Sequence, residues 1–362
     1  MRVALDEQIF VIQKYGGISR MFAELASQFA GSGFPDMSLQ PLHAPIVNRY
    51  VLEDSKLSEY LKARSAKNQY SALLRYMSRL NLSVDADIVH NTFYLPHGLT
   101  PARGAKRIVT VHDMIPELLP STRRRLDFLT LKRRYVESAD HIVCVSESTK
   151  EDLLKVYGVP SAPISVVHHG VDPRFHPDIE KLDFLPERYI LFVGNRDGYK
   201  DAKVLFRAFA ELSLIDSTIE LLCVGGAGLS AAEVKFLEEL GVRDKVAQRH
   251  LDDLSMVSAY AHAEVFVFPS HFEGFGIPAL EAMACGTPVV LAHATSLPEV
   301  GGDAAAYFTA GDSVDLAAVL IDLLQDPGAL ADLRARGLAR AAELTWHRAA
   351  QSMADTYSDA LG

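Results

Sequence analysis

Short apolar runs alternate with amphipathic segments along the whole chain. The runs have the length of buried strands and lie at residues 2–5, 88–90, 108–112, 141–145, 164–168, 189–193, 220–224, 246–249, 265–268, 288–291 and 305–308. Segments with helical spacing separate most of them, for example 19–30, 126–137, 203–214, 229–240, 254–262 and 313–325. Strands that alternate with helices form parallel sheets covered on both faces. We therefore predict an α/β fold built from doubly wound, Rossmann-like sheets.

A proline-rich stretch divides the two series of strands. Residues 171–187 contain three prolines and lack clean periodicity, as is typical of a segment between domains. We place the boundary there, with one domain over residues 1–172 and a second over residues 173–345. Ligands bind to such folds at the carboxyl ends of the strands, so we expect a cleft where the two domains face each other.

Composition and charge narrow the classes of function. Of the 362 residues, 49% are hydrophobic and 23% are charged, which is ordinary for a globular protein. The formal net charge is −10. Bulk nucleic-acid binding needs a basic surface, so we expect no nucleic-acid partner.

The charge is unevenly spread along the chain. The first 175 residues carry 22 basic and 18 acidic side chains, while the remainder carries 14 basic and 28 acidic ones. Two basic stretches with interleaved apolar residues, 62–80 and 123–134, are expected to form amphipathic helices. Their basic faces are either solvated faces over a core, or they contact anionic lipid or an anionic lipid-linked acceptor, with the protein peripheral to a membrane.

The cysteines and the first residues indicate a compartment. Three cysteines stand far apart and form no CxxC pair, so neither disulfides nor a cysteine zinc site are expected. Arg2, Asp6 and Glu7 interrupt the first ten residues, which argues against a signal peptide. No apolar run approaches the roughly 18 residues of a membrane span. We expect a cytoplasmic protein, or one at the inner face of the cell membrane.

The most informative motif is the sequence SHFEGFGIPALE, which begins just after the strand predicted at 265–268. Pro278 suits the first turn of a helix, so Gly274 and Gly276 fall in a strand-to-helix loop. Without a Cβ atom they let the backbone approach a ligand closely. The free N–H groups at the start of the helix bind an anion, most simply a phosphate.

Two carboxylates in the same motif point to a different chemical partner. Glu273 lies in the loop and Glu281 about one turn into the helix. A carboxylate can accept two hydrogen bonds from a vicinal diol, and both ribose and a hexose present diols. A phosphate-binding loop combined with diol-binding acids indicates a sugar nucleotide.

The stretch from Glu273 to Glu281 resembles the signature of the family 4 retaining glycosyltransferases, and the resemblance extends over essentially the whole chain. It implies the GT-B fold, in which two doubly wound Rossmann-like domains face each other across a cleft, the first for the acceptor and the second for the nucleotide sugar. It also implies that Glu273 contacts the transferred sugar and that Glu281 binds the ribose hydroxyls. Further candidate donor contacts are Gly274, Phe275, Gly276 and Ile277.

A second signature, FVGNRDGYKD, begins in the strand predicted at 189–193. Its Lys200 and Arg196 could neutralise a departing diphosphate, and one well-placed donor of this kind is worth roughly 2.7–4 kcal/mol in catalysis. The family often has Arg-Lys at positions 199 and 200. Tyr199 replaces that Arg here, so Arg196 is the candidate substitute, and Gly194 is a candidate donor contact. The Gly-Tyr-Lys version is similar to a subset of mannosyl- and rhamnosyltransferases, and a solvated basic loop is the alternative.

The first domain offers two further candidate segments. The sequence QKYGGISR opens a helix after the first strand, so the amides of Gly16 and Gly17 can face the donor diphosphate, although an ordinary turn would use the same residues. The sequence TVHD ends another strand. In the family a His at this position contacts the donor sugar or the reaction centre, which makes His112 a candidate; a structural His is the alternative. Residues 145–147 and 169–172 also match family positions around the cleft.

Two patterns that imitate metal sites are set aside. Asp85-Ala86-Asp87 precedes a predicted strand, so it faces the edge of the sheet opposite to the ligand-binding edge, and we do not expect it to hold a cation. His168 and His169 are adjacent on a predicted strand, where neighbouring side chains point to opposite faces. No metal and no other cofactor is expected.

The leading hypothesis is a retaining glycosyltransferase that moves a hexose, with mannose or rhamnose favoured, from a nucleotide-diphosphate sugar of the GDP type. The acceptor would be a surface polysaccharide, such as the O-antigen of lipopolysaccharide, or a lipid-linked oligosaccharide. The closing helix, over residues 346–362, is expected to cross back to the first domain, as the last helix of the family does. A sugar-nucleotide 2-epimerase of the same fold and a non-catalytic sugar-nucleotide-binding protein stay open as alternatives.

Overall fold

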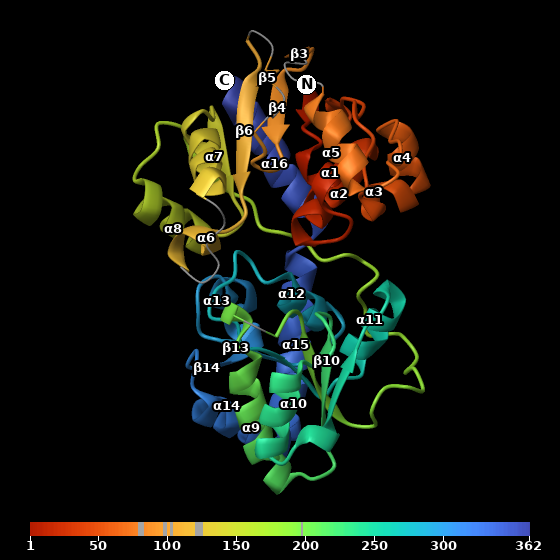
Figure 1. The fold of residues 1–362 in the computed structure, drawn as a ribbon, viewed down its shortest axis with the longest axis vertical. Helices are drawn as coiled ribbons and strands as arrows, with labels where there is room; N and C mark the ends of the chain where they lie inside the picture. The colour runs from red at the N-terminus through yellow and green to blue at the C-terminus, as the bar shows by residue number, and fades with distance from the viewer. Residues whose placement is uncertain (79–82, 97–99, 102–103, 120–125, 197) are drawn as a thin grey trace. The chain divides into compact units, whose positions relative to one another are not determined.

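The computed structural model describes residues 1–78, 83–96, 100–101, 104–119, 126–196 and 198–362. Its contacts divide the chain into two compact units (Figure 1). The N-terminal unit consists of Met1–Gly170 together with Trp346–Gly362, and the C-terminal unit consists of Val171–Thr345. Each unit is built around a six-stranded sheet of its own.

The sheet of the N-terminal unit has the strand order β2-β1-β4-β6-β7-β8, with every pair parallel. Its strands are β1 (Arg2–Leu5), β2 (Ser38–Leu39), β4 (Ile88–Asn91), β6 (Lys106–Val111), β7 (His141–Cys144) and β8 (Ile164–Val166); β3 (Ser83–Val84) and β5 (Thr100–Pro101) form a separate short pair. From β1 the chain adds β2 on one side and the remaining strands on the other. This order confirms the doubly wound prediction.

Helices cover this sheet. They are α1 (Gln8–Ile12), α2 (Gly17–Ala30), α3 (Arg49–Glu53), α4 (Ser55–Tyr60), α5 (Gln69–Met77), α6 (Ile115–Leu118), α7 (Leu126–Glu137), α8 (Glu147–Tyr157) and α16 (Trp346–Leu361). The last helix, α16, packs against α2. His90 at the centre of the sheet is fully buried, and its Nδ1 and Nε2 lie 2.7 Å from Tyr357 Oη and 2.7 Å from Thr110 Oγ1. The buried imidazole thus links α16 to the sheet.

The sheet of the C-terminal unit has the strand order β11-β10-β9-β12-β13-β14, again parallel throughout. Its strands are β9 (Tyr189–Val193), β10 (Glu220–Val224), β11 (Val246–Arg249), β12 (Val265–Phe268), β13 (Val289–Ala292) and β14 (Ala305–Phe308). The chain moves from β9 outward through β10 to β11 and then returns to β12 on the other side of β9. Ligands of doubly wound sheets bind at such a reversal, which lies here at the ends of β9 and β12.

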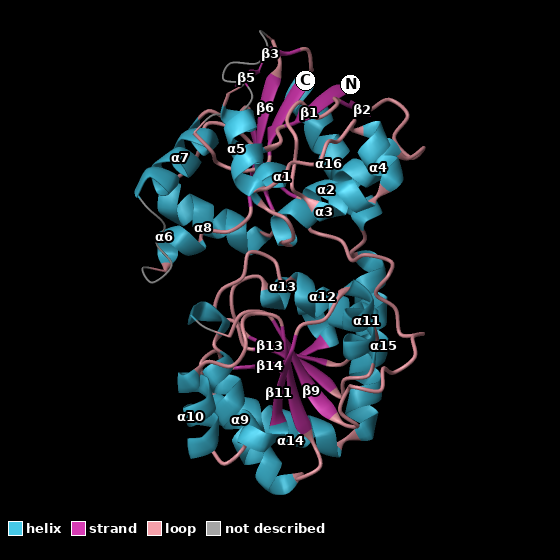
Figure 2. Ribbon diagram, turned by 45° about the vertical axis from the view of Figure 1, so that its right-hand side comes forward, coloured by secondary structure: helices cyan, strands magenta, loops and turns pink. Residues whose placement is uncertain are grey.

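Helices flank this sheet on both sides (Figure 2). They are α9 (Ala202–Ile215), α10 (Ala231–Glu239), α11 (Asp253–Ala261), α12 (Ile277–Ala284), α13 (Leu297–Gly301), α14 (Ser313–Gln325) and α15 (Pro327–Glu343), with short 3₁₀ turns η2 (Gly198–Lys200), η3 (Arg243–Lys245) and η4 (Gly302–Ala304). Helix α9 packs against α14, and α12 packs against α15. The four central strands, β10, β9, β12 and β13, are almost entirely buried between these layers, which explains their continuous apolar sequences.

The prediction of one amphipathic helix over residues 62–80 is wrong in extent. Among the described residues of this range, only α5, nine residues long, is an α-helix. Lys62 has a φ of 49°, outside the helical region, and Lys67 also precedes the helix. Asn68 ends the loop because its side chain accepts a hydrogen bond from the N–H of Ser71 and so caps α5. Arg79 and Leu80 lie outside the described residues.

The second basic stretch also differs from the expectation of an exposed basic face. Lys132 on α7 is buried, and its Nζ lies 3.0 Å from Glu117 Oε2. It also donates a hydrogen bond to the carbonyl of Asp113. A buried ammonium needs a carboxylate partner, and Glu117 on α6 provides one that lies fifteen positions earlier in the chain. Arg123, Arg124 and Arg125 lie outside the described residues.

The Asp85 and Asp87 carboxylates bind Arg2 at the start of β1. Arg2 Nη1 lies 2.5 Å from Asp85 Oδ2, and the Arg2 N–H donates to Asp87 Oδ2 at 2.7 Å. Both acids therefore act at the amino edge of the sheet. Within the part of the chain that the structure describes, no helix combines the length and the apolar character needed to cross a bilayer.

Candidate functional site

The ends of β9 and β12 bring together a cation and a carboxylate. Lys200 closes η2, which follows β9, and Glu273 lies in the loop after β12. Lys200 Nζ lies 2.5 Å from Glu273 Oε1, and the side chains are only 19% and 11% exposed. Lys200 Nζ also lies 5.0 Å from the centre of the Phe268 ring. Because little water screens this pair, its attraction is stronger than that of a surface ion pair.

A second contact joins the same two loops. The N–H of His271 donates to the carbonyl of Tyr199 at 2.8 Å, and His271 Nε2 lies 2.5 Å from Asp201 Oδ2. Asp201 has a φ of 46°, a left-handed conformation that a short acidic side chain tolerates better than most. The loops after β9 and β12 are therefore joined by a backbone hydrogen bond as well as by the Lys200–Glu273 ion pair.

The loop before α12 is fixed by two hydroxyl side chains from the next strand-to-helix loop. The N–H of Glu273 donates to Thr295 Oγ1 at 3.0 Å, and Ser296 Oγ donates to the carbonyls of Glu273 and Phe275 at 3.0 and 2.8 Å. Gly276 has a φ of 113°, and a Cβ there would lie 2.8 Å from Leu297 Cδ2, so glycine is required. Helix α12 begins directly afterwards at Ile277, with Pro278 in its first turn.

Glu281 lies in α12 and is buried. Tyr260 Oη donates a hydrogen bond to Glu281 Oε2 at 3.0 Å, and the Tyr260 ring packs edge-on against Phe175, with ring centres 5.7 Å apart. The hydrogen bond orients the carboxylate, since Tyr260 itself is fully buried and cannot move freely. Glu273 and Glu281 thus share one loop-and-helix segment, each with its own partner.

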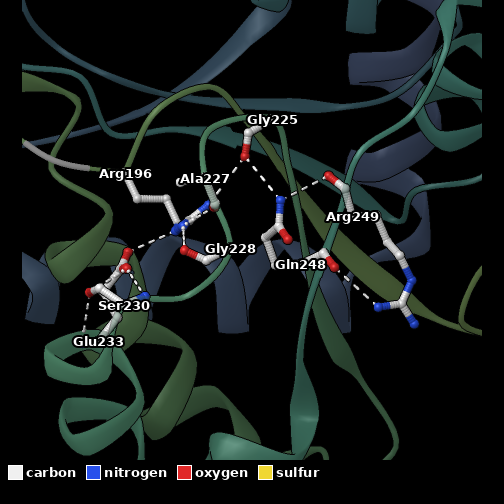
Figure 3. A network of polar contacts seen from close by, with 8 residues as sticks. All are labelled: Arg196, Gly225, Ala227, Gly228, Ser230, Glu233, Gln248 and Arg249. Carbon is white, nitrogen blue, oxygen red and sulfur yellow. Dashed lines mark hydrogen bonds and ion pairs between the residues drawn. The ribbon is translucent and has the colours of Figure 1, made fainter.

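Arg196 lies at the end of β9, where it holds the loop between β10 and α10 (Figure 3). Its side chain is 5% exposed, and its Nε lies 2.7 Å from Glu233 Oε1. The two terminal nitrogens donate to the carbonyls of Gly225, Ala227 and Gly228 at 3.2, 2.6 and 3.1 Å. Three of these bonds go to the loop and the fourth goes to Glu233 in α10, whereas Lys200, the other predicted cation, pairs with Glu273.

The same loop is attached to the neighbouring strand β11. Gln248 Nε2 donates to the carbonyls of Gly225 and Arg249 at 3.3 and 3.1 Å, and the N–H of Gly225 donates to the carbonyl of Arg249 (Figure 3). Gly194, at the end of β9, donates its N–H to the carbonyl of Val224. The carboxyl ends of β9, β10 and β11 therefore form one connected edge.

In the N-terminal unit, His112 follows the end of β6 and is buried. Its ring meets Phe22 edge-on, with ring centres 5.8 Å apart. Burial lowers the pKa of His112 to about 3, so the ring is neutral at physiological pH. Burial lowers the pKa of His169 to about 3 as well, and the ring of His169 lies 5.7 Å from that of Trp346 on α16.

Gly16 and Gly17 lie at the start of α2, as the sequence predicts for a loop that opens a helix. The side chain of Gln13 occupies the space beside Gly16, where a Cβ would lie 2.4 Å from Gln13 Cδ. Gln13 Oε1 accepts a hydrogen bond from the N–H of Ser19 at 2.9 Å. Gly16 thus leaves room for a side chain that fixes the first turn of the helix.

Two parallel sheets with this site at the ends of β9 and β12 define a glycosyltransferase of the GT-B fold. Residues 15–175 match the family described as Glycosyltransferase Family 4, and residues 177–340 match the one described as Glycosyl transferases group 1. The chain belongs to this family, the group 1 or family 4 glycosyltransferases, and is a hexosyltransferase.

Two relatives are mannosyltransferases. The chain is 28% identical over 330 residues to O-antigen chain mannosyltransferase B of Escherichia coli, which covers 82% of this chain and 85% of the relative. It is 31% identical over 298 residues to the MMP α-(1→4)-mannosyltransferase of Mycolicibacterium hassiacum, with coverage of 76% and 71%. Among solved structures, sucrose-phosphate synthase from Thermosynechococcus elongatus has the same fold, with a TM-score of 0.73 at 20% identity over 99% of this chain and 98% of that one.

Replacing Arg196 with Met is expected to destabilise the C-terminal unit by about 2–4 kcal/mol, because it removes the cation that pairs with Glu233 and the hydrogen bonds to the carbonyls of Ala227 and Gly228. The midpoint of thermal unfolding should fall by roughly 5 °C or more. Lys203→Met is the matched control, since Lys203 is exposed on α9. Equal midpoints for the two variants would contradict the role of the Arg196 network.

The unfolding free energy is expected to fall as the pH drops from 7 to 5. Burial lowers the pKa of His90, His112 and His169 to about 3, so below pH 6.5 the unfolded chain takes up protons that the folded chain does not. Each of these three imidazoles lowers the unfolding free energy by up to about 1.4 kcal/mol for every pH unit of acidification. Burial raises the pKa of Asp6 to about 6, so on acidification this carboxylate takes up a proton in the folded chain before it does so in the unfolded chain. Asp6 therefore offsets the effect of one of the three imidazoles.

Denaturant unfolding at several pH values measures this slope. His112→Asn removes one of the three imidazoles. The difference in bound protons between the unfolded and folded chains should then fall by about one, which makes the dependence of the unfolding free energy on pH less steep. A stability that is constant or rises between pH 7 and 5 would show that these imidazoles are not held neutral.

Proposed function

We propose that the protein is a retaining glycosyltransferase that moves mannose or rhamnose from a nucleotide-diphosphate sugar, of the GDP type, to a polysaccharide or a lipid-linked oligosaccharide. The observation that carries the proposal is the ion pair between Lys200 and Glu273 beside the glycine loop and the start of α12. The two mannosyltransferase relatives support mannose as the transferred sugar.

The ion pair gives each partner a role when a donor binds. Lys200 would move to the diphosphate and balance the negative charge that grows as the nucleotide departs. Glu273 would then accept hydrogen bonds from hydroxyls of the transferred sugar. In the absence of donor the two groups satisfy each other, so neither charge is buried without a partner. Lys200 supplies the positive charge of the site in this proposal, and no metal is assigned.

The remaining residues hold the donor in place. Glu281, oriented by Tyr260, would accept hydrogen bonds from the ribose diol. The backbone from Gly274 to Ile277 would bind the diphosphate with N–H groups at the start of α12. Arg196 would contribute indirectly, because its hydrogen bonds fix the β10–α10 loop at this edge of the sheet. Gly194 lies at the same edge of the sheet.

The N-terminal unit would provide the acceptor side. His112, kept neutral by burial, would hydrogen-bond the reacting sugar, and the Gly16–Gly17 backbone would face the diphosphate. As the bond between the sugar and the diphosphate breaks, the acceptor hydroxyl forms the new bond on the same face. The departing phosphate oxygen takes the hydroxyl proton. A lipid-linked acceptor would bring the enzyme to the cytoplasmic face of a membrane.

A panel of nucleotide sugars, incubated with and without a lipid-linked oligosaccharide, tests the reaction class. Release of nucleoside diphosphate that depends on the acceptor supports transfer. Release without acceptor, with a free epimerised sugar, indicates a 2-epimerase instead. Tight binding without turnover indicates a binding protein.

Charge-neutral variants of the two acids separate their roles. Glu273→Gln is expected to lower kcat by about 10²–10³-fold, because its bonds to the sugar matter in the transition state. Glu281→Gln is expected to raise the donor KM by roughly 10-fold or more with a smaller effect on kcat, since the ribose does not react. Glu238→Gln on the exposed face of α10 is the control. Turnover equal to the control in both variants would contradict the assignment.

A further inference from the structure

A small cavity lies in the N-terminal unit. Its volume is about 250 Å³. Its walls come from the loop before α2, from α3 and the residues before it, and from the loop before α5. The lining residues are Lys14, Val47, Arg49, Leu52, Ser65, Ala66, Lys67, Asn68 and Gln69. We call this cavity the basic pocket.

Hydrogen bonds join the three wall segments to one another. The N–H of Arg49 donates to the carbonyl of Lys14 at 3.0 Å, and Asn48 Nδ2 donates to the carbonyl of Gln13 at 3.0 Å. On the other side, Gln69 Nε2 donates to the carbonyl of Ile12 at 2.6 Å. One backbone bond and two side-chain bonds therefore hold together wall segments that are far apart in the sequence.

The charge of the basic pocket is one-sided. Of its described lining residues, three are cationic and none is acidic. Arg49 forms a long ion pair with Glu53, in which Nη1 lies 3.9 Å from Oε1 and both side chains are well exposed to solvent. No described residue forms an ion pair with Lys14 or Lys67. Lys14 and Lys67 therefore have no carboxylate partner among the described residues, although Lys14 Nζ lies 5.8 Å from the centre of the Tyr15 ring. A guanidinium beside two ammonium groups suits phosphate oxygens in particular.

We propose that the basic pocket binds a phosphate or diphosphate group of the acceptor. This inference rests on the proposed function, because it assigns the substrate class of the acceptor side. The volume fits a small anionic group, since pockets for drug-sized ligands begin near 300 Å³. The position also fits, because Lys14 lies two residues before Gly16, in the loop proposed to face the donor diphosphate. An acceptor held here by its phosphate would present its sugar to the same loop.

The binding of inorganic pyrophosphate, measured by calorimetry, tests the pocket without requiring any glycosyl transfer. All proteins carry Lys200→Gln and Glu273→Gln together, which weakens binding at the donor site without leaving a buried charge unpaired. The double variant Lys14→Gln/Lys67→Gln is expected to bind pyrophosphate at least 10-fold more weakly than this parent. The matched control is Lys56→Gln/Lys62→Gln, which removes two exposed lysines of the same region that do not line the pocket.

Equal affinities for the two double variants would overturn the proposal, provided that their thermal midpoints match. Because all four lysines are exposed, the fold should tolerate each replacement. The pyrophosphate result stands even if no sugar is transferred, so failure of the pocket and failure of the proposed function are distinguishable.

Two soluble phosphates then identify the source of the anion. Tighter binding of geranyl diphosphate than of mannose 1-phosphate, lost in the pocket variant, indicates the diphosphate of a lipid-linked acceptor. The reverse order indicates a phosphate on the glycan. Vesicles of phosphatidylcholine with phosphatidylglycerol are the third probe. Binding to these vesicles without binding to any soluble phosphate would show a general membrane surface and would overturn the proposal.

Discussion

The adjacency of β9 and β12 is the constraint on which the site depends. The chain runs from β9 to β10 and later returns to β12 on the other side of β9. The loops that follow the neighbouring strands β9 and β12 therefore lie side by side. One loop carries Lys200 and the other Glu273, and they form a short, mostly buried ion pair. Removing either charge would leave the other desolvated and unpaired. A diphosphate sugar offers each of them a new partner, which links the resting arrangement to the reaction.

The loops around this pair are held by hydrogen bonds from segments that do not take part in the chemistry. Thr295 and Ser296 fix the backbone on either side of Glu273, and Tyr260 fixes the carboxylate of Glu281. Arg196 does the same for the β10–α10 loop. Preorganisation of this kind matters because groups that are already in place need not reorganise when charge develops.

Much of this could be predicted from the sequence, because buried parallel strands are continuous apolar runs. Strands β9 to β12 lie where the runs predict them, and the motif around Gly276 marks a strand-to-helix loop. The ion-pair partners of Arg196 and Lys132 could not be predicted, because they lie far away along the chain. Glu233 is 37 positions from Arg196, and Glu117 is 15 positions from Lys132. Periodicity indicates which face of an element a residue occupies but not which distant side chain it meets, so it does not predict that Arg196 pairs with Glu233 or that Lys132 pairs with Glu117.

A crystal structure with an intact sugar nucleotide, such as a non-hydrolysable GDP-mannose analogue, tests the central claim most directly. The diphosphate is expected at the start of α12 with Lys200 turned toward it, the sugar hydroxyls on Glu273, and the ribose on Glu281. A donor bound elsewhere, with the Lys200–Glu273 ion pair still intact, would contradict the account.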